Sequence, residues 1–442
     1  MTEGVVLALT GFAMITAFLV FIMTKRVSAV VALIVIPIVF ALVLGHGIGT
    51  GAMMLKGVQQ VAPTAALMIF AIFYFGIMID AGLFLPLVKV IVRWVGDDPL
   101  RATLGHAALV TIVSLDGDST TTLLVTVASL LPIYRRLGMN VMIFAVIGGL
   151  CGTILNLMPW GGPSARVAAI LKLPSSVLFV PLLPTMAAGL TATFALAWWF
   201  GLRERKRLAG RVVGAAEAAP DDEALATAFE TDTWALRPRM IWFNVALTAI
   251  MMVAITFDLA PILAVFMTGT ALALMFNYPK TTDQRARVLK YGGNVLNVAI
   301  MVLAAGAFTG VLSGTGMVGA MAQSIVHALP PSWGPHLGLV TAVLASPGAF
   351  FLSNEGYYFG VLPVIAHAAE AYGITTDQIG RASLLGLQMH GLSPLVAALY
   401  LKMALLNIDL ADFQRFAFKY YLPITILMIT VAVLSGAVPS GF

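Results

Sequence analysis

Residues 101–134 read RATLGHAALVTIVSLDGDSTTTLLVTVASLLPIY, which is two short apolar runs around a cluster of hydroxyls, carboxylates and glycine. A helix needs about 20 apolar residues to cross roughly 30 Å of bilayer hydrocarbon, so neither 101–113 nor 121–134 can cross alone. Irregular backbone at that depth must be buried in protein or face a water-filled cavity, because lipid satisfies no backbone polar group. The stretch is therefore predicted to be a re-entrant hairpin with its tip at 114–122.

The rest of the chain is equally apolar. Of its 442 residues, 60% are hydrophobic and only 10% are charged, against about 25% charged in an average soluble protein. This composition excludes a cytosolic enzyme, a nucleic-acid-binding protein and a disordered chain. The start of the chain lacks the positive region of a signal peptide, so its first apolar stretch is expected to be retained as a membrane helix. We expect an all-α polytopic membrane protein that is not an enzyme.

The pattern of apolar stretches predicts a topology. Stretches long enough to cross the membrane lie at 4–22, 28–45, 62–79, 139–156, 176–201, 239–256, 258–276, 294–313 and 413–436. Region 336–372 is predicted to be a second re-entrant hairpin, and 376–407 a span that breaks near 390–394. With the amino terminus outside, all of the 25 basic residues except Lys56, Arg166, Lys172 and Arg381 fall on the cytoplasmic side, Lys402 included. This asymmetry obeys the positive-inside rule and predicts about 11 transmembrane helices, two hairpins and both termini outside.

The two halves of the chain resemble each other. FGIMIDAG (75–82) pairs with TGVLSGTG (309–316), LDGDSTTT (115–122) with FLSNEGYY (351–358), and WGGPSARVAA (160–169) with HGLSPLVAAL (390–399). Three matches in one order indicate a duplication, and on this topology the repeats are inverted, which is typical of secondary transporters. The expected parts are a first scaffold (1–100), a first transport part (101–201), a cytoplasmic linker (202–238), a second scaffold (239–335) and a second transport part (336–442).

The first hairpin tip contains candidate binding residues. Hydroxyls of Ser119, Thr120 and Thr121, together with freed amides at the start of the next helix, can bind an anion. Carboxylates are costly at membrane depth and mark ion or proton sites, so Asp116 and Asp118 are candidates for a divalent cation or a proton. The alternative is that these two acids only cap the helix at 121–134.

The first broken span supplies a second group of candidates, which is Asn156, Gly161, Gly162, Ser164 and Arg166. Arg166 is the only basic residue predicted at membrane depth. Its guanidinium suits a substrate carboxylate, and the alternative is a structural pair with Asp116 or Asp118.

The second tip and the second break repeat this arrangement. Ser353 and Asn354 are neutral donors and acceptors, and Glu355 is a candidate proton carrier whose alternative role is an N-cap. His390 and Ser393 follow in the second break, where His390 can titrate, touch the substrate or only pack. Weaker candidates, predicted to lie at span ends, are Asp80, His106, His367 and Glu370. The absence of a GxxxxGK[ST] loop indicates an ion gradient rather than ATP as the energy source.

Five motifs resemble the family of citrate–metal–proton symporters. They are SLDGDSTTT (114–122), LPIYRRLGMN (131–140), NLMPWGGPSARV (156–167), SNEGYYFGVLPV (353–364) and GRASLLG (380–386), within a resemblance that covers 32–416. The resemblance implies that citrate is carried with Mg²⁺ or Ca²⁺ as part of the substrate, with no permanently bound cofactor. It also implies a homodimer in the lipid bilayer of the inner membrane, with transport domains that slide past a scaffold like an elevator.

The chain departs from the family pattern at Glu355–Gly356 and at 387–390, which leaves room for another polycarboxylate or ion. We expect a secondary active symporter that imports citrate, or a close polycarboxylate, as a divalent-metal complex together with protons. Two alternatives stay open: a sodium-coupled carrier of metal-free di- or tricarboxylates, and a metal-ion or arsenite-type permease.

Overall fold

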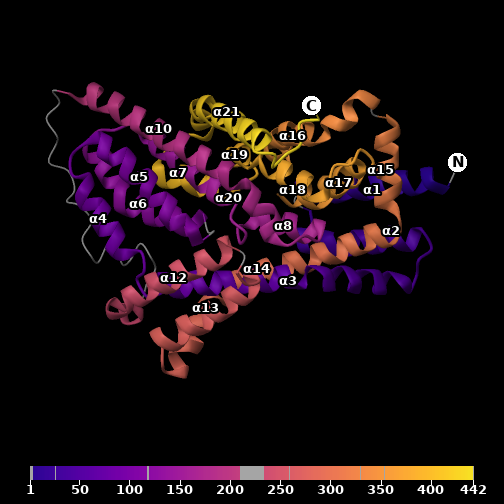
Figure 1. Ribbon diagram of the computed structural model, residues 1–442, viewed down its shortest axis with the longest axis horizontal. Helices are drawn as coiled ribbons and strands as arrows, with labels where there is room; N and C mark the ends of the chain where they lie inside the picture. Colours follow the sequence, from indigo (N-terminus) through magenta and orange to yellow (C-terminus); the bar gives the residue numbers. More distant parts are fainter. Residues whose placement is uncertain are drawn as a thin grey trace.

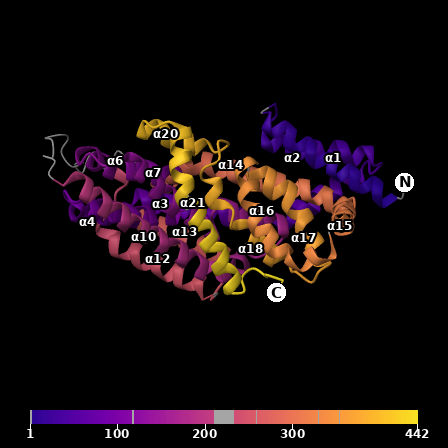
Figure 2. The same cartoon turned by 90° about the horizontal axis from the view of Figure 1, so that it is seen from above.

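The computed structural model describes residues 3–24, 26–116, 119–209, 233–257, 259–328, 330–352 and 354–441. All regular elements in these residues are helices, so the all-α prediction is confirmed for them. Figures 1 and 2 show an elongated bundle in which the indigo-to-magenta half and the orange-to-yellow half lie side by side along much of the length.

The first half of the chain runs from α1 to α10. Its elements are α1 (Glu3–Met23), α2 (Ala29–Val43), α3 (Gly49–Asp80), α4 (Leu85–Val95), α5 (Pro99–Val113), η1 (Ser114–Asp116), α6 (Ser119–Arg136), α7 (Val141–Leu155), α8 (Gly162–Leu171), α9 (Ser175–Phe179), η2 (Val180–Leu182) and α10 (Leu183–Leu208).

The second half runs from η3 to α21. Its elements are η3 (Thr233–Ala235), η4 (Pro238–Met240), α12 (Ile241–Thr256), α13 (Ile262–Asn277), α14 (Thr281–Gly314), α15 (Met317–Ala328), η5 (Pro331–His336), α16 (Leu337–Phe351), the π-helical η6 (Gly356–Val361), α17 (Leu362–Glu370), α18 (Thr376–Leu384), α19 (Leu387–His390), α20 (Ala397–Leu406) and α21 (Leu410–Leu434).

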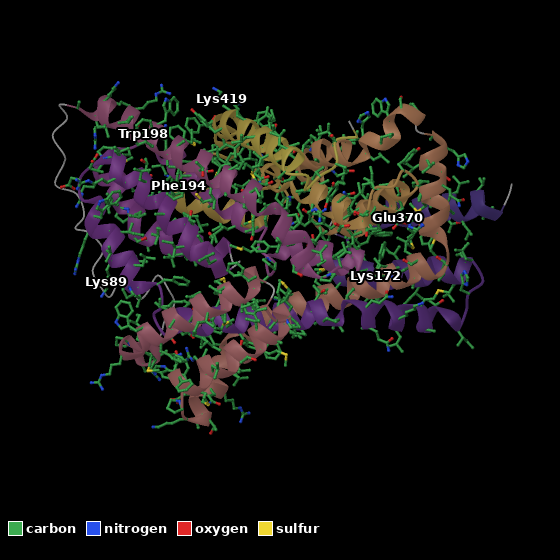
Figure 3. All side chains as sticks on the ribbon, in the orientation of Figure 1. Lys89, Lys172, Phe194, Trp198, Glu370 and Lys419 are labelled. Atoms are coloured by element: carbon green, nitrogen blue, oxygen red, sulfur yellow. The ribbon has the colours of Figure 1, made fainter. Side chains whose placement is uncertain are left out.

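The helices have the lengths and surfaces of a membrane protein. In the described residues, seven helices are long and apolar enough to cross a bilayer, and four shorter apolar helices accompany them. Large apolar side chains stay exposed on them, as with Trp198 of α10 and Trp242 of α12, which are 52% and 81% exposed. Figure 3 labels Trp198 on α10, and it also labels Lys89 and Lys419 in the left half of the view and Lys172 in the right half. Lys172 was predicted to lie on the opposite side of the membrane from the other two.

Two of the predicted spans are parts of much longer helices. The stretch 62–79 lies within the 32 residues of α3, and 294–313 lies within the 34 residues of α14. The polar residues before each apolar stretch are also helical. Hydropathy therefore predicts the part of the helix that lies in the bilayer hydrocarbon, and it does not predict where the helix begins.

Each region predicted to be a re-entrant hairpin contains two helices that pack against each other. Helix α5 packs against α6 after the short turn at η1, and α16 packs against α17 after the turn that precedes η6. Residues Ser332–Phe351, which include α16, are long and apolar enough to cross a membrane alone. Composition therefore does not separate α16 from a full span, and the re-entrant course of this region stays a prediction.

The duplication is visible in the backbone turns. Gly138 and Gly373 have φ values of 68° and 75° and precede α7 and α18, where a residue with a side chain would be strained. Lys172 and Asn407, with φ values of 58° and 54°, end the equivalent helices α8 and α20. Both pairs are separated by 235 residues.

This spacing corrects one predicted pairing. Residues 160–169 are equivalent to 395–404 and not to 390–399, because α8 and α20 begin and end 235 residues apart. The first break contains two prolines, and the sequence comparison aligned Pro163 with Ser393 where the structure aligns Pro159 with Pro394. Arg166 therefore corresponds to Leu401, which directly precedes Lys402.

The equivalent helices α3 and α14 run antiparallel through the centre of the molecule. Gly57 contacts Gly310 near one end of the pair and Gly76 contacts Tyr291 near the other, so the residue numbers rise on α3 as they fall on α14. Glycine lets the two backbones approach closely. Helix α8 packs against both α3 and α14, so this central pair supports the helix that follows the first break.

Candidate functional site

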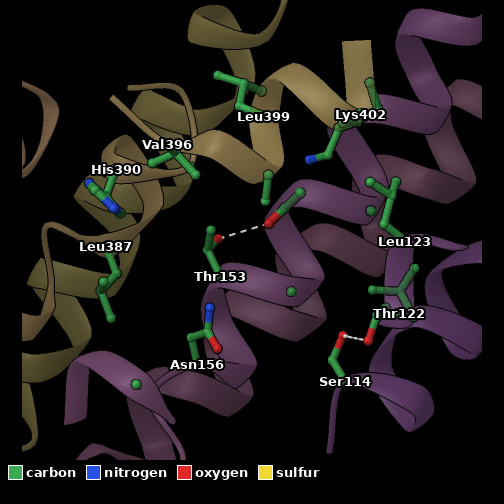
Figure 4. Close-up of a pocket in the computed structure, with 18 of the residues that line it drawn as sticks. Ser114, Thr122, Leu123, Thr153, Asn156, Leu387, His390, Val396, Leu399 and Lys402 are labelled. Atoms are coloured by element: carbon green, nitrogen blue, oxygen red, sulfur yellow. Dashed lines mark hydrogen bonds between the residues drawn. The ribbon is translucent and has the colours of Figure 1, made fainter. Parts of the chain in front are cut away.

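A cavity of about 300 Å³ lies where both hairpin tips and both broken spans meet. Its walls come from α5, α6, α7 and α8 in the first half, and from the second tip, α19 and α20 in the second half. Five of the predicted site residues line it: Asn156, Gly162, Arg166, Asn354 and His390. Figure 4 shows His390 on the yellow part of the chain and Asn156 on the purple part. Residues more than 200 positions apart in the sequence thus share one small-molecule-sized chamber.

Arg166 links the two halves across this cavity. Its Nη2 lies 3.0 Å from Oε1 of Glu355, and the two side chains are 23% and 19% exposed. Its Nε is buried with no hydrogen-bond partner among the described residues. Asp116 and Asp118, the alternative partners predicted for Arg166, have no described side chains, and among the described side chains Arg166 pairs with Glu355. The reason is that α8 lies beside the second tip, a contact that sequence spacing does not show.

The second half contributes two directed polar groups. His390 Nδ1 lies 2.6 Å from the carbonyl oxygen of Ala349 and donates to it, which leaves Nε2 for the cavity. Asn354 lines the same cavity, and its Oδ1 is buried with no partner among the described residues. An amide and an imidazole in these positions can accept or donate one hydrogen bond each to a polar ligand.

Three predicted ligands have structural contacts instead. Ser164 Oγ donates to the carbonyl of Leu157 at 3.0 Å, and Ser393 Oγ donates to the carbonyl of Phe350 at 2.7 Å. A β-carbon on Gly161 would lie 2.8 Å from the carbonyl carbon of Asn156, so this glycine allows the tight turn of the break. None of the three is among the residues that line the cavity.

The remaining predictions concern residues with little or no description. Asp118 and Ser353 lie outside the described residues. Asp116 ends η1, and Ser119, Thr120 and Thr121 begin α6, so their backbone is at the first tip. In the described part of the chain, no three histidine, cysteine, aspartate or glutamate residues group together to hold a metal ion.

Hydroxyl groups cover the wall between the two tips. Ser114 Oγ donates to Thr122 Oγ1 at 3.3 Å, which ties the two arms of the first hairpin together (Figure 4). Thr126 and Thr153 line the cavity as well, and each donates to a carbonyl one turn earlier in its own helix. Their oxygens can still accept a hydrogen bond, so this wall is polar without being charged.

Sequence reasoning did not place Lys402 or His106 in the cavity. Lys402 was predicted on the cytoplasmic side and His106 at a span end, yet both line the cavity, from α20 and α5. Charge counting placed Lys402 at the cytoplasmic side, because 376–407 was treated as one span that breaks near 390–394. In the structure, α20 is a separate helix packed on α6 and α7. The signal that could have located Lys402 is a single cation inside the apolar run AALYLKMALL.

Comparison with known proteins places this geometry in context. A family model described as citrate transporter matches residues 18–386. A Bacillus subtilis (strain 168) protein named "Citrate transporter" is 48% identical and is covered over 98% of this chain and 99% of its own length. A second protein of that organism, named "Mg(2+)/citrate complex secondary transporter", is 40% identical with the same coverage. The solved Alcanivorax borkumensis YdaH transporter has a TM-score of 0.61 at 12% identity, covering 87% of both chains, and this likeness concerns the fold alone.

Proposed function

The chain belongs to the citrate transporter family, and we propose that it is a secondary active symporter that carries citrate, or a close polycarboxylate, as a divalent-metal complex with protons. The observation that supports this most is the cavity in which both tips and both breaks meet. In inverted-repeat transporters, the substrate site lies where discontinuous helices of the two halves converge. The similarity to a Mg(2+)/citrate complex secondary transporter supports Mg²⁺, or Ca²⁺, as part of the substrate.

The cavity residues fit a carboxylate ligand. Arg166 can donate two parallel hydrogen bonds to one carboxylate, and Asn156 and Asn354 can hydrogen-bond a second polar group. On their sequence position alone, we assign the metal or a proton to Asp116 and Asp118 at the first tip, and substrate carboxylates to the hydroxyls of 119–121 and Ser353. Binding a divalent ion lowers the negative charge that has to be desolvated when citrate leaves water.

The Arg166–Glu355 pair suggests how protons are coupled to substrate. A proton that binds the Glu355 carboxylate removes the charge that holds Arg166 and frees its guanidinium for a substrate carboxylate. Glu355 is 19% exposed and contacts Arg166, which lines the cavity. We propose this exchange as the coupling step, and Asp116 or Asp118 as further proton or metal sites.

The repeat supports a moving transport domain. We propose that 101–201 and 336–442 form the part that moves, that 1–100 and 239–335 form the scaffold, and that 202–238 is a cytoplasmic linker. We further propose a homodimer in the inner membrane that imports its substrate by an elevator motion, with both termini outside.

Uptake of labelled citrate into proteoliposomes tests the substrate and the coupling. We would impose an inward proton gradient and compare Mg²⁺, Ca²⁺, Na⁺ and a chelator. The expected result is uptake that needs both a divalent ion and the proton gradient, so that the chelator abolishes it. Sodium-driven uptake that persists in the chelator would contradict the proposal in favour of a metal-free carboxylate carrier. Metal movement without any organic anion would contradict it in favour of a metal-ion permease.

Matched variants connect this uptake to the cavity. Asn354→Ala removes a cavity-lining amide and is expected to lower uptake. Gln323→Ala removes an exposed amide on α15 and is expected to leave uptake unchanged. Equal uptake by the two variants would mean that the substrate binds elsewhere.

A further inference from the structure

One wall of the cavity is formed by a glycine pair on α7, Gly148 and Gly149. A β-carbon on Gly149 would lie 3.1 Å from Lys402 Nζ and 3.3 Å from Cζ of Tyr421, whose hydroxyl is closer still. A β-carbon on Gly148 would lie 3.4 Å from His106 Nε2. The absence of side chains on α7 at these two adjacent positions lets His106 of α5 approach Gly148, and Lys402 of α20 and Tyr421 of α21 approach Gly149. His106 and Lys402 line the cavity, and the Tyr421 hydroxyl lies against the same glycine as Lys402.

These polar groups have no acceptor in the described part of the chain. His106 is fully buried, and both of its ring nitrogens lack a hydrogen-bond partner there. The hydroxyl of Tyr421 is likewise buried and without a partner. Lys402 lines the cavity and forms no ion pair with a described carboxylate, whereas Arg166 is held by Glu355. Buried polar groups are almost always hydrogen-bonded, so a cluster of orphaned donors indicates a missing acceptor.

The ring of His106 is held in a fixed orientation. It stacks on Phe144 with ring centroids 3.9 Å apart and an angle of 20°, and the edge of Tyr134 packs against it. The internal repeat relates Lys402 to Arg166. Lys402 of α20 directly follows Leu401, which is the residue equivalent to Arg166 of α8. Each half therefore places one cation in the cavity from the same helix of the repeat.

We propose that Lys402, His106 and Tyr421 form a second anion-binding pole of the cavity, which binds a carboxylate of the substrate that Arg166 does not reach. The inference rests on the proposed function and refines it to a substrate with a third carboxylate, which remains after Arg166 and the metal ion have bound the other two. Lys402 supplies the charge, and Tyr421 and His106 donate hydrogen bonds to the same carboxylate. A dicarboxylate bound by Arg166 and the metal ion has no carboxylate left for this pole, so the pole selects for tricarboxylates.

Binding to the purified full-length protein in detergent tests the assignment. We would titrate citrate and the dicarboxylate succinate, each with Mg²⁺, against the wild type and K402Q. Hydrogen bonds to charged groups predict a loss of about 10- to 100-fold in citrate affinity for K402Q, with little change for succinate. K402R keeps the charge and is expected to recover part of the citrate affinity. K419Q removes an exposed lysine on α21 as the matched control, and should bind as the wild type does.

Y421F is a second variant that is expected to fold, because it removes only one hydroxyl from a buried ring. It is expected to weaken citrate binding several-fold and leave succinate binding unchanged. A purely structural Tyr421 would affect both ligands equally. Wild-type citrate affinity in K402Q, or equal losses for both carboxylates, would overturn the second pole while leaving transport of the metal complex intact. No binding of any carboxylate by the wild type would overturn the pole and the proposed function together.

Discussion

Arg166 and Glu355 show how much of the site depends on one pair of side chains. They come from the first broken span and the second hairpin tip, and their charged atoms lie 3.0 Å apart. Removing one partner of an enclosed ion pair costs more than the pair itself contributes, because the other charge is left without compensation. The pair is nevertheless open to the cavity on one side, so a proton or a substrate carboxylate can replace either partner.

The first prediction concerns Glu355→Gln. This variant keeps the shape of the side chain but cannot bind and release a proton, so citrate accumulation is expected to lose its response to an inward proton gradient. Exchange of labelled for unlabelled citrate, which needs no net proton movement, should persist. Both activities are measured in proteoliposomes.

Glu370→Gln is the matched control, since Glu370 is an exposed acid of the same hairpin, 46% accessible and paired with His367. It should retain gradient-driven accumulation. If Glu355→Gln still accumulates citrate with the wild-type response to pH, Glu355 is not the proton carrier.

At the scale of elements, the glycines between α3 and α14 decide how close the two halves of the chain come. A β-carbon on Gly310 would lie 2.9 Å from Cα of Gly57, and one on Gly57 would lie 2.7 Å from Cα of Gly310. Backbone atoms cannot move aside as a flexible side chain can. At the far end of the pair, Asp80 is fully buried and lies 2.6 Å from both Arg287 Nη1 and Lys290 Nζ. The glycines near one end and the buried ion cluster at the other thus hold α3 and α14 at a fixed distance from each other.

The second prediction follows from this packing. Gly310→Ala is expected to push α3 and α14 apart and to destabilise the protein by about 1–3 kcal/mol, which is typical of overpacking. Gly293→Ala on the same helix adds its methyl group to open space and should be neutral or slightly stabilising. Thermal unfolding in detergent measures both. Equal melting temperatures for the two variants would mean that the helix pair tolerates separation.

At the scale of the whole molecule, an aromatic cluster joins the proposed moving and fixed parts. Trp160 in the first break packs on Phe266 of α13, with ring centroids 5.1 Å apart, and its Nε1 donates to Leu115 at the first tip at 2.8 Å. Phe75 of α3 packs on the same Phe266 at 5.9 Å. One contact therefore crosses the proposed boundary and the other stays inside the scaffold.

The third prediction uses these two contacts as a cross-linking pair in a C151S background, since Cys151 is the chain's one cysteine. A short bifunctional thiol reagent on W160C/F266C is expected to abolish citrate uptake, because it ties the moving part to the scaffold. The same reagent on F75C/F266C should leave most uptake intact. Uptake in proteoliposomes before and after treatment measures the effect. Full activity of cross-linked W160C/F266C would rule out a sliding motion between these parts.

Much of the architecture is readable from local patterns. Apolar runs of sufficient length, short runs around polar clusters, and the repeated motifs predict an all-helical membrane protein with two hairpins and two breaks. These features depend on residues that are neighbours in the chain, so hydropathy and turn chemistry are enough to find them. Two amides that line the cavity, Asn156 and Asn354, were located for the same reason, whereas the lining hydroxyls of Thr126 and Thr153 were not.

The contacts between helices that are far apart in the sequence were decided by tertiary packing alone. The partner of Arg166, the position of Lys402 beside Gly149, and the burial of His106 against Phe144 join residues from helices that are far apart in the sequence. The correct register of the repeat also needed the observed helix ends, because two prolines in the first break gave the pattern two ways to align. Charge counting assigns a lysine to a membrane side, but whether its ammonium meets solvent or a cavity depends on which helix packs against it. The sequence by itself determined the class of protein and its broken helices, and only the packing of the two halves determined which charges face one another.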